Sequence, residues 1–443
     1  MAPAGKRNTA MQAKLIRLAP TLGGEGESEV RYYSRNMPCT FRTARNALVT
    51  DEDGNEYIDF LSACGSLNYG HNHPRLKQPA VEYLLADGML NGLDLNTVAR
   101  RDFIRKFREV VLEPRGLEYK LQFTGPTGTN AVEAALKLAR KVTGRTTVVA
   151  FSNAFHGVSL GALAATGNRA ARRASLALLQ GVVRLPYDGY GGAGVADLDR
   201  YEGMARDGSG GLEPPAAFIV ETVQGEGGLN VASVPWLRRL AEVARRLDAL
   251  LIVDDVQAGC GRTGPFFSFE RAGIAPDLVC LSKSLSGLGL PMSLVLIRPD
   301  RDAWAPGEHN GTFRGNNLAF VTAAAALDFW TDREFLSAVA RRAAAVEAWT
   351  EEVVVAHPGL GLRAKGLGMM RGVEFPTGEL TARVVRAAFE RGVLVETAGP
   401  EDEVLKLLPP LTIEDDVLAE GLRRVRDAIQ AELAEFEGAV RAA

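Results

Sequence analysis

The sequence of 443 residues has few cysteines, and none is spaced for a disulfide framework or a zinc site. Cys39, Cys64, Cys260 and Cys280 form no C-x-x-C pair, which is typical of thiols in a reducing compartment. Runs of about 18 apolar residues are missing, and the N-terminal stretch MAPAGKRNTAMQAKLIRLAP lacks the continuous apolar core of a signal peptide. We therefore expect a soluble cytoplasmic protein without a metal site.

A charge excess of either sign is also missing. Lys and Arg together number 51 and Asp and Glu 54, which leaves a net charge of −3. This balance gives no electrostatic reason to expect nucleic acid or an anionic membrane as a partner, so we expect small molecules. The length is sufficient for two or three domains with a large core.

Short apolar runs alternate with helical patterns through the middle of the chain. The runs occupy residues 146–151, 216–220, 250–253, 278–281 and 293–297. Helical spacing of apolar residues is clearest at 130–142 and 235–248. Continuous apolar strands between helices predict an α/β fold with a mostly parallel sheet covered on both faces. The glycine-rich stretch 187–215 predicts loops around a short helix.

The two ends of the chain have a different pattern. From residue 326 a long helical stretch is followed by short strands, a helix near 380–392 and an amphipathic helix from 414, which predicts a smaller α+β domain over 326–443. Residues 75–325 would form the large domain. Residues 1–74, where DEDGNEYIDF predicts a hairpin turn, are expected to join the small domain, partly on the family resemblance described below.

Chemically reactive side chains follow three of the apolar runs. Glu221 follows the second run, Asp254 the third, and Ser282 and Lys283 the fourth. Ligands of open α/β sheets bind outside the carboxyl ends of the strands, so these endings indicate one crevice.

The stretch LLIVDD at 250–255 allows two interpretations, which are a magnesium-nucleotide site and an anchor for a cofactor with a basic ring nitrogen. It is similar to a strand that holds magnesium in nucleotide hydrolases, but the sequence has no glycine-rich loop with GK[ST] to bind the phosphates. The stretch TGPTGTNAVEAALK places Gly128 and Thr129 before a helix, where free N–H groups favour a phosphate. A plain N-cap by Thr129 or Asn130 explains this stretch equally well.

Lys283 favours the second interpretation, an aldehyde cofactor with a basic ring. A lysine directly after a buried strand can form a Schiff base, although such lysines are more often surface residues. A phosphate site, this lysine and Asp254 are together the three anchors expected of pyridoxal phosphate, whose protonated ring withdraws electrons from the substrate.

A series of motifs in order resembles the class III, fold-type I, pyridoxal-phosphate-dependent aminotransferases. The motifs are NYGHNHP (68–74), FTGPTGTNAVEAALKLAR (123–140), FHG (155–157), ETVQGEGG (221–228), DDVQAGCGRTG (254–264), SKSLSG (282–287), GTFRGNN (311–317) and LPPLTI (408–413). Within the family, the sequence is most similar to the diaminobutyrate–2-oxoglutarate branch of ectoine biosynthesis. This resemblance implies transfer of an amino group from L-glutamate to L-aspartate 4-semialdehyde.

The resemblance also implies roles for residues at matching positions. Lys283 would hold the cofactor and move protons as general acid and base, and Asp254 would bind the ring nitrogen. Thr312 would bind the phosphate in the partner's site, which implies a homodimer. The other cofactor-binding positions would contact the ring or the phosphate, and they are Gly128, Thr129, Phe155, His156, Val256 and Gln257.

Two family glutamates match Glu221 and Glu226, which are expected to bind substrate. Glu226 matches a glutamate that pairs with an arginine and releases it when an α-amino dicarboxylate binds. Lys406 occupies the arginine position here, and a lysine lacks the planar fork that grips a carboxylate at two points. Recognition of glutamate would therefore differ in detail.

Three further polar residues are expected to have structural roles rather than roles in catalysis or metal binding. Asp255 is expected to bond nearby backbone or a basic residue such as Arg262 rather than to act in catalysis. His71 and His73 could ligate a metal but have no evident third ligand, so a turn is favoured.

The alternatives to the diaminobutyrate reaction remain open at this level. An aminotransferase for another ω-amine, such as ornithine, 4-aminobutyrate or a diamine, or an aminomutase would use the same motifs. A non-catalytic binding protein of the same fold is a more distant alternative.

Overall fold

The computed structural model describes residues 27–442. The first 26 residues of the predicted N-terminal segment, with the expectation that no signal peptide is present, lie outside the described residues. None of the helices between these limits is both long and apolar enough to cross a membrane.

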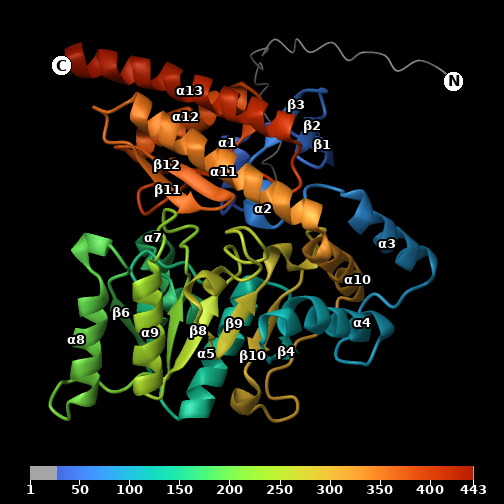
Figure 1. The fold of residues 1–443 in the computed structure, drawn as a ribbon, viewed down its shortest axis with the longest axis vertical. Coiled ribbons are helices and arrows are strands. Elements are labelled where there is room, and N and C mark those ends of the chain that lie inside the picture. Colours follow the sequence, from blue (N-terminus) through green and yellow to red (C-terminus); the bar gives the residue numbers. More distant parts are fainter. Residues whose placement is uncertain (1–26, 443) are drawn as a thin grey trace.

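A sheet of seven strands occupies the lower half of Figure 1, in the order β4-β10-β9-β8-β7-β5-β6. Its strands are β4 (Lys120–Phe123), β5 (Val148–Phe151), β6 (Val182–Leu185), β7 (Ala217–Val220), β8 (Leu250–Asp254), β9 (Leu278–Leu281) and β10 (Leu294–Ile297). Strands β5 to β9 pair in parallel, which confirms the predicted mostly parallel sheet.

Strand β10 is antiparallel to both of its neighbours, β9 and β4. The segment between β9 and β10 contains only a short 3-10 turn, Lys283–Ser286. The connection has no helix to cover a face of the sheet in a crossover, and the chain returns antiparallel here.

Helices cover both faces of this sheet. Those of the middle region are α3 (Pro74–Leu85), α4 (Val98–Phe107), α5 (Gly128–Thr143), α6 (Leu160–Ala165), α7 (Arg169–Arg172), α8 (Val195–Arg206), α9 (Val234–Arg246) and α10 (Asn317–Ala326). Helices α5 and α9 coincide with the two clearest helical patterns in the sequence. The predicted short helix within 187–215 is α8, so this prediction is also confirmed.

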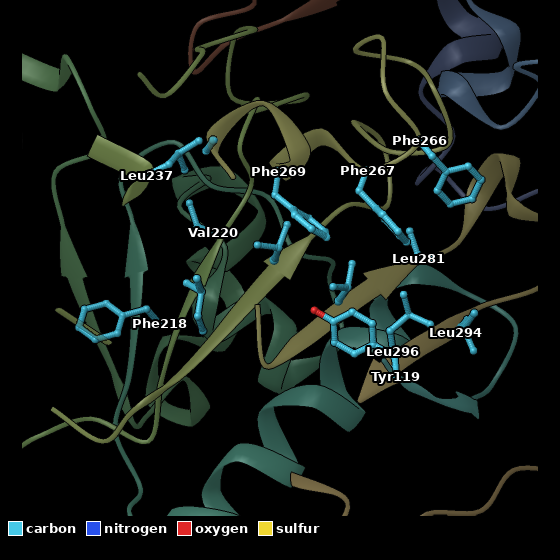
Figure 2. Packing of buried hydrophobic residues seen from close by; sticks show 14 of the residues in the cluster. Tyr119, Phe218, Val220, Leu237, Phe266, Phe267, Phe269, Leu281, Leu294 and Leu296 are labelled. Atoms are coloured by element: carbon cyan, nitrogen blue, oxygen red, sulfur yellow. The ribbon is translucent and has the colours of Figure 1, made fainter. Parts of the chain in front are cut away.

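The apolar runs are continuous because alternate residues of one strand belong to opposite cores. Phe218 and Val220 of β7 pack in a cluster with α4 and α9, whereas Ala217 and Ile219 pack in a cluster with α5. Neighbours on a strand point to opposite faces, and both faces are covered, so no polar alternation is left. Figure 2 shows part of the first cluster, including Phe218, Val220 and Leu237 of α9.

The strands near the start of the described residues, β1 to β3, and the C-terminal elements lie together in the upper half of Figure 1. One sheet has the order β1-β2-β3-β13 and another β11-β12-β15-β14. Their strands are β1 (Phe41–Arg45), β2 (Leu48–Asp51), β3 (Glu56–Asp59), β11 (Arg363–Leu367), β12 (Met370–Glu374), β13 (Val393–Leu394), β14 (Glu396–Ala398) and β15 (Val404–Leu407). The helices of these regions are α1 (Tyr33–Asn36), α2 (Ser62–Gly65), α11 (Arg333–Ala356), α12 (Gly378–Glu390) and α13 (Asp415–Ala442).

The predicted hairpin is the antiparallel pair of β2 and β3. Strand β3 pairs in parallel with β13 from the far end of the sequence. One apolar cluster joins Ile58 and Phe60 to Val384 of α12 and Val425 of α13. The N-terminal strands thus pack with the C-terminal elements, although the domain boundaries at 74 and 325 stay a prediction.

Candidate active site

Three strand ends place reactive side chains at one edge of the large sheet. Asp254 is the last residue of β8, Lys283 begins the 3-10 turn two residues after β9, and Glu221 follows β7 directly. These strands are parallel neighbours, so their carboxyl ends meet at the same edge, as the sequence indicated.

Asp254 is a buried carboxylate paired with a buried histidine. Its Oδ2 lies 2.8 Å from Nδ1 of His156, and its Oδ1 accepts a hydrogen bond of 3.2 Å from the backbone N–H of Val256. Burial lowers the pKa of His156, but the hydrogen bond and charge of Asp254 outweigh it, so the pKa is raised above its usual 6.5. The hydrogen bond to His156 thus fixes the position of the Asp254 carboxylate at the end of β8.

Lys283 is half-buried and has a left-handed backbone, with φ of 48°. Such a conformation costs free energy in a non-glycine residue, and both flanking serines fix it. The hydroxyl of Ser282 donates to the carbonyl of Met292 (2.8 Å), and that of Ser284 donates to the carbonyl of Gly65 (2.7 Å). Ser284 therefore ties the lysine turn to the N-terminal part of the chain.

The first turn of α5 lies against the loop after β8. A Cβ atom added to Gly128 would come within 2.8 Å of Cγ1 of Val256, so only glycine allows this approach. The N-cap residue is Thr127, and its side chain makes no capping hydrogen bond. Thr129 instead shares a hydrogen bond of 2.7 Å with Ser159, so the plain N-cap by Thr129 or Asn130 is not formed. The free N–H groups of this turn can donate hydrogen bonds to an anion.

Glu221 joins two loops that border the site. Its Oε2 accepts from the backbone N–H of Phe155 (2.9 Å), and its Oε1 accepts from the N–H of Gly225 (3.2 Å). Burial and the charge of Asp254 raise its pKa to about 7, although His156 opposes this rise. Glu221 thus acts on both loops through their backbone.

Gln257 contacts the opposite side of the site. Its Nε2 donates to the carbonyl of Cys64 and to Oε1 of Glu226, both at 3.1 Å. Its Oε1 is buried and has no donor among the described residues. The predicted partner of Gln257, an oxygen on the cofactor ring, would need this same amide.

Lys406 is fully buried between two carboxylates. Its Nζ lies 2.8 Å from Oε1 of Glu226 and 2.9 Å from Oε1 of Glu396. Burial lowers the pKa of Lys406, but the two carboxylates raise it well above its usual value. Burial raises the pKa of Glu226, but Lys406 and then Lys283 outweigh this effect and bring it to about 2. The pKa of Glu396 is raised, because its burial outweighs the attraction of Lys406.

Sequence reasoning missed Glu396 and Cys64. Glu396 lies directly opposite Lys406 in the antiparallel pair of β14 and β15. The Cys64 thiol lies 3.5 Å from Oε1 of Glu226 and 3.5 Å from Oε2 of Glu396. The available signal was the stretch VETAGPEDEVLKL, where opposite charges within two short apolar runs face each other across a turn.

Cys64 belongs to a turn with a left-handed backbone in four successive residues. The φ angles are 48° at Ser62, 47° at Ala63, 60° at Cys64 and 78° at Gly65. The Ser62 hydroxyl donates to the carbonyl of Leu408 at 2.6 Å. A cavity of about 1210 Å³ lies beside this turn and is bordered by Ala63, but neither Lys283 nor Asp254 borders it.

Thr312 lies away from these contacts. It is exposed on the segment that precedes α10. The neighbouring Gly311 approaches the backbone of Gly125, at the start of the glycine-rich stretch before α5. That Thr312 reaches the site of a partner stays a prediction.

The residues with structural interpretations have local partners. Asp255 accepts from the backbone N–H of Ser268 (3.0 Å) and from its hydroxyl, as the first interpretation predicted, whereas Arg262 points to Asn68 and two carbonyl groups. His71 bonds Asp59 at 2.8 Å, and His73 caps the first turn of α3. Within residues 27–442, the only group with metal-ligand spacing is Cys64, Glu226 and Glu396, and Nζ of Lys406 already lies between its carboxylates.

This geometry agrees with the comparisons to known proteins. The family model of the class III aminotransferases matches residues 30–429, so the chain belongs to this pyridoxal-phosphate-dependent family. It is 55% identical to a diaminobutyrate–2-oxoglutarate transaminase of Nocardia farcinica, over 91% of this chain and 92% of the relative. A protein of the same name from Vibrio cholerae is also 55% identical, over 89% of this chain and 96% of the relative.

Solved structures confirm the predicted fold. An ornithine aminotransferase from Toxoplasma gondii superposes with a TM-score of 0.78 and 28% identity, covering 90% of this chain and 92% of that one. An aminotransferase from Bacillus anthracis gives a TM-score of 0.80 at 23% identity, over 92% and 96% of the two chains, and supports the fold alone.

The residues present fit pyridoxal phosphate. The ring nitrogen requires a carboxylate, and the Asp254 carboxylate is held in place by His156. The phosphate requires free N–H groups, and the uncapped start of α5 provides them. The aldehyde requires an amine, and Lys283 lies at the same sheet edge.

Proposed function

We propose that this protein transfers the amino group of L-glutamate to L-aspartate 4-semialdehyde, which gives L-2,4-diaminobutyrate and 2-oxoglutarate. The observation that carries the proposal is the 55% identity to diaminobutyrate–2-oxoglutarate transaminases over about nine-tenths of the chain. The arrangement of Lys283, Asp254 and the start of α5 supports it independently of the names of these relatives.

Pyridoxal phosphate, when bound, supplies an aldehyde that takes up the amino group and a protonated ring that withdraws electrons. Lys283 holds the aldehyde end and moves the proton at the reacting carbon as general base and acid. Asp254 binds the ring nitrogen, and His156 holds this carboxylate in place by a hydrogen bond. These two residues thus keep the ring in its electron-withdrawing state.

The other cofactor-binding residues orient the ring and the phosphate. Gly128 and Thr129 bind the phosphate at the start of α5. Phe155 stacks on the ring, Val256 packs on the other face, and Gln257 bonds the ring oxygen. The contact between Gly128 and Val256 supports this assignment, because it joins the phosphate and ring positions in one packed unit.

Glu226 and Lys406 bind the end of the substrate that lies away from the reacting carbon. The ammonium group of Lys406 attracts the remote carboxylate of glutamate when Glu226 moves aside. Glu226 is the more accessible member of this ion pair, because 28% of its side chain is exposed whereas Lys406 is fully buried. Glu221 contributes to substrate binding through the loops of Phe155 and Gly225 that it holds.

The remaining parts of the proposal concern assembly and location. Two subunits form a homodimer in which Thr312 reaches the phosphate site of the partner, which agrees with its exposure on one chain. The protein acts in the cytoplasm, where the four free cysteines of the described residues would stay reduced. The product feeds the biosynthesis of ectoine or another compound that contains diaminobutyrate.

Initial rates test the proposed reaction. Purified protein with pyridoxal phosphate should convert L-glutamate and L-aspartate 4-semialdehyde with parallel lines in double-reciprocal plots, because the amino group is stored between two half-reactions. Intersecting lines, or no consumption of L-glutamate, would refute the proposal. The ornithine aminotransferase among the structural relatives supports one rival substrate, so L-ornithine belongs in the same assay.

A further inference from the structure

The environment of Lys406 contains more negative than positive charge. Glu226 and Glu396 both contact its ammonium group, and Cys64 contacts both carboxylates without adding a charge. Burial raises the pKa of the Cys64 thiol to about 11, so it stays neutral near pH 7. Within ion-pair distance, two carboxylates share one ammonium, which leaves one unbalanced negative charge in direct contact when both glutamates are ionised; Lys283 acts on them from beyond that distance.

A buried acceptor without a partner lies beside the same cluster. The amide of Gln257 donates to Glu226, and its Oε1 has no donor within residues 27–442 although the residue is only 9% exposed. Most buried polar atoms in folded proteins have a hydrogen-bond partner, so this oxygen is a candidate acceptor for a bound ligand. A substrate ammonium group has three donors and one positive charge, so it matches both the unpaired oxygen and the charge excess.

We propose that Glu396 is a specificity-determining residue, whose charge makes the pocket select a substrate with an ammonium group remote from the reacting carbon. This inference rests on the proposed function and deepens it. In L-2,4-diaminobutyrate the terminal amine reacts and the α-ammonium is the remote group. When the remote group is the carboxylate of L-glutamate, a proton on Glu396 removes the unbalanced charge and leaves Lys406 available.

Glu396 is the carboxyl group of this cluster whose pKa is raised above its usual value, because burial outweighs the attraction of Lys406. The groups that face it are Lys406 on β15, Glu226 after β7, Cys64 on α2, Tyr33 on α1 and Lys283 after β9. Glu226 has a pKa of about 2 and remains ionised, and the pKa of Lys406 lies well above its usual value. The pKa of Tyr33 is raised by burial, so its hydroxyl stays neutral.

Two substrates that differ only in the remote ammonium test the proposal. L-2,4-diaminobutyrate and 4-aminobutyrate share the terminal amine and the carboxylate, but only the former has an α-ammonium. We divide kcat/KM for L-2,4-diaminobutyrate by kcat/KM for 4-aminobutyrate. In E396Q we expect this ratio to fall about tenfold, because one charge at short range is lost. The kcat/KM for L-glutamate should not fall. The matched control is E401Q, which removes the charge of an exposed glutamate in the same hairpin and should leave the ratio unchanged.

The pH dependence of the wild-type ratio gives a second test that needs no substitution. The charge of Glu396 appears as the pH rises past its raised pKa, so the preference for L-2,4-diaminobutyrate should increase over the pH range above the usual glutamate pKa of 4.5. Titrations linked to the cofactor, such as that of Glu221, affect both substrates and cancel in the ratio. The ratio for E396Q should be flat over this range.

The outcomes separate this inference from the proposed function. A wild type that converts both substrates, with a ratio that E396Q leaves unchanged, overturns the role of Glu396 and leaves the proposed function standing. An equal loss on both substrates in E396Q means a structural role and also overturns it. A wild type that converts L-ornithine but not L-2,4-diaminobutyrate overturns the proposed function and the inference together.

Discussion

Replacing Lys406 by methionine should destabilise the protein in a manner that depends on pH. The substitution keeps the length of the side chain but removes the charge between Glu226 and Glu396. The pKa of Glu226 falls from 4.5 to about 2 in the folded protein, chiefly because the attraction of Lys406 outweighs burial. At 1.36 kcal/mol per pKa unit, this shift corresponds to roughly 3 kcal/mol of stability near pH 7.

The sign of the effect follows from the two carboxylates. In the wild type, the contribution of Glu226 is present above pH 4.5 and is lost as the pH falls through about 2. In K406M both carboxylates lose the cation that contacts them and only the attraction of Lys283 remains, so the folded pKa of each rises. The penalty should therefore be largest at pH 8, where ionisation is complete in the unfolded chain, and should shrink as the pH is lowered to 5.

Thermal unfolding at pH 5, 6, 7 and 8 measures this prediction. K406M should melt well below the wild type at pH 8, and the deficit should be smaller at pH 5, where only the lost contribution of Glu226 remains. K77M is the matched control, because Lys77 is exposed on α3, and its melting should follow the wild type throughout. Adding E226Q to K406M should restore part of the stability, since it removes one uncompensated carboxylate. A deficit of K406M that is constant with pH, or larger at pH 5, would refute the reasoning.

Three further substitutions probe the cofactor site and its surroundings. K283A should lose the visible absorption of the bound cofactor and nearly all turnover; a protein whose cofactor is still fixed covalently by borohydride would contradict the role of Lys283. G128A would bring a Cβ to 2.8 Å from Cγ1 of Val256, so affinity for pyridoxal phosphate in a fluorescence titration should fall about tenfold, and adding V256A should restore part of it. Burial raises the pKa of Asp255 to about 7, so its contribution to stability is lost as the pH rises from about 4 towards 7. The melting temperature of D255N should therefore fall less than that of the wild type between pH 5 and 8. An equal fall in both proteins would contradict the raised pKa.

The large sheet could be predicted from sequence because its strands are buried on both faces. Each apolar run of four to six residues coincides with a strand within two residues, and α5 and α9 coincide with the helical patterns between them. Strands β4 and β6 were missed. All four residues of β6 are only half-buried, so its segment has no apolar run as continuous as those of the inner strands. The antiparallel direction of β10 depends on how its connection folds, which periodicity does not encode.

The candidate site was predictable where chemistry follows a strand directly. Asp254, Lys283 and Glu221 could be placed at one edge because parallel strands end together. Glu396 could not be placed there, because its contact with Lys406 depends on the register of β14 against β15. The pairing of His156 with Asp254 likewise joins a loop after β5 to the end of β8, and only the folded arrangement reveals it.

The left-handed turn at Ser62–Gly65 has a consequence for when the site is completed during synthesis. A left-handed backbone costs roughly 1–2 kcal/mol for each non-glycine residue, so three such residues need support from elsewhere. Part of that support is the carbonyl of Leu408, to which Ser62 donates. Residue 408 leaves the ribosome long after residue 62, when about nine-tenths of the chain has been made. The turn that carries Cys64 is therefore completed late, and a nascent chain that has already folded its large sheet still lacks the contacts of Cys64 with Glu226 and Glu396.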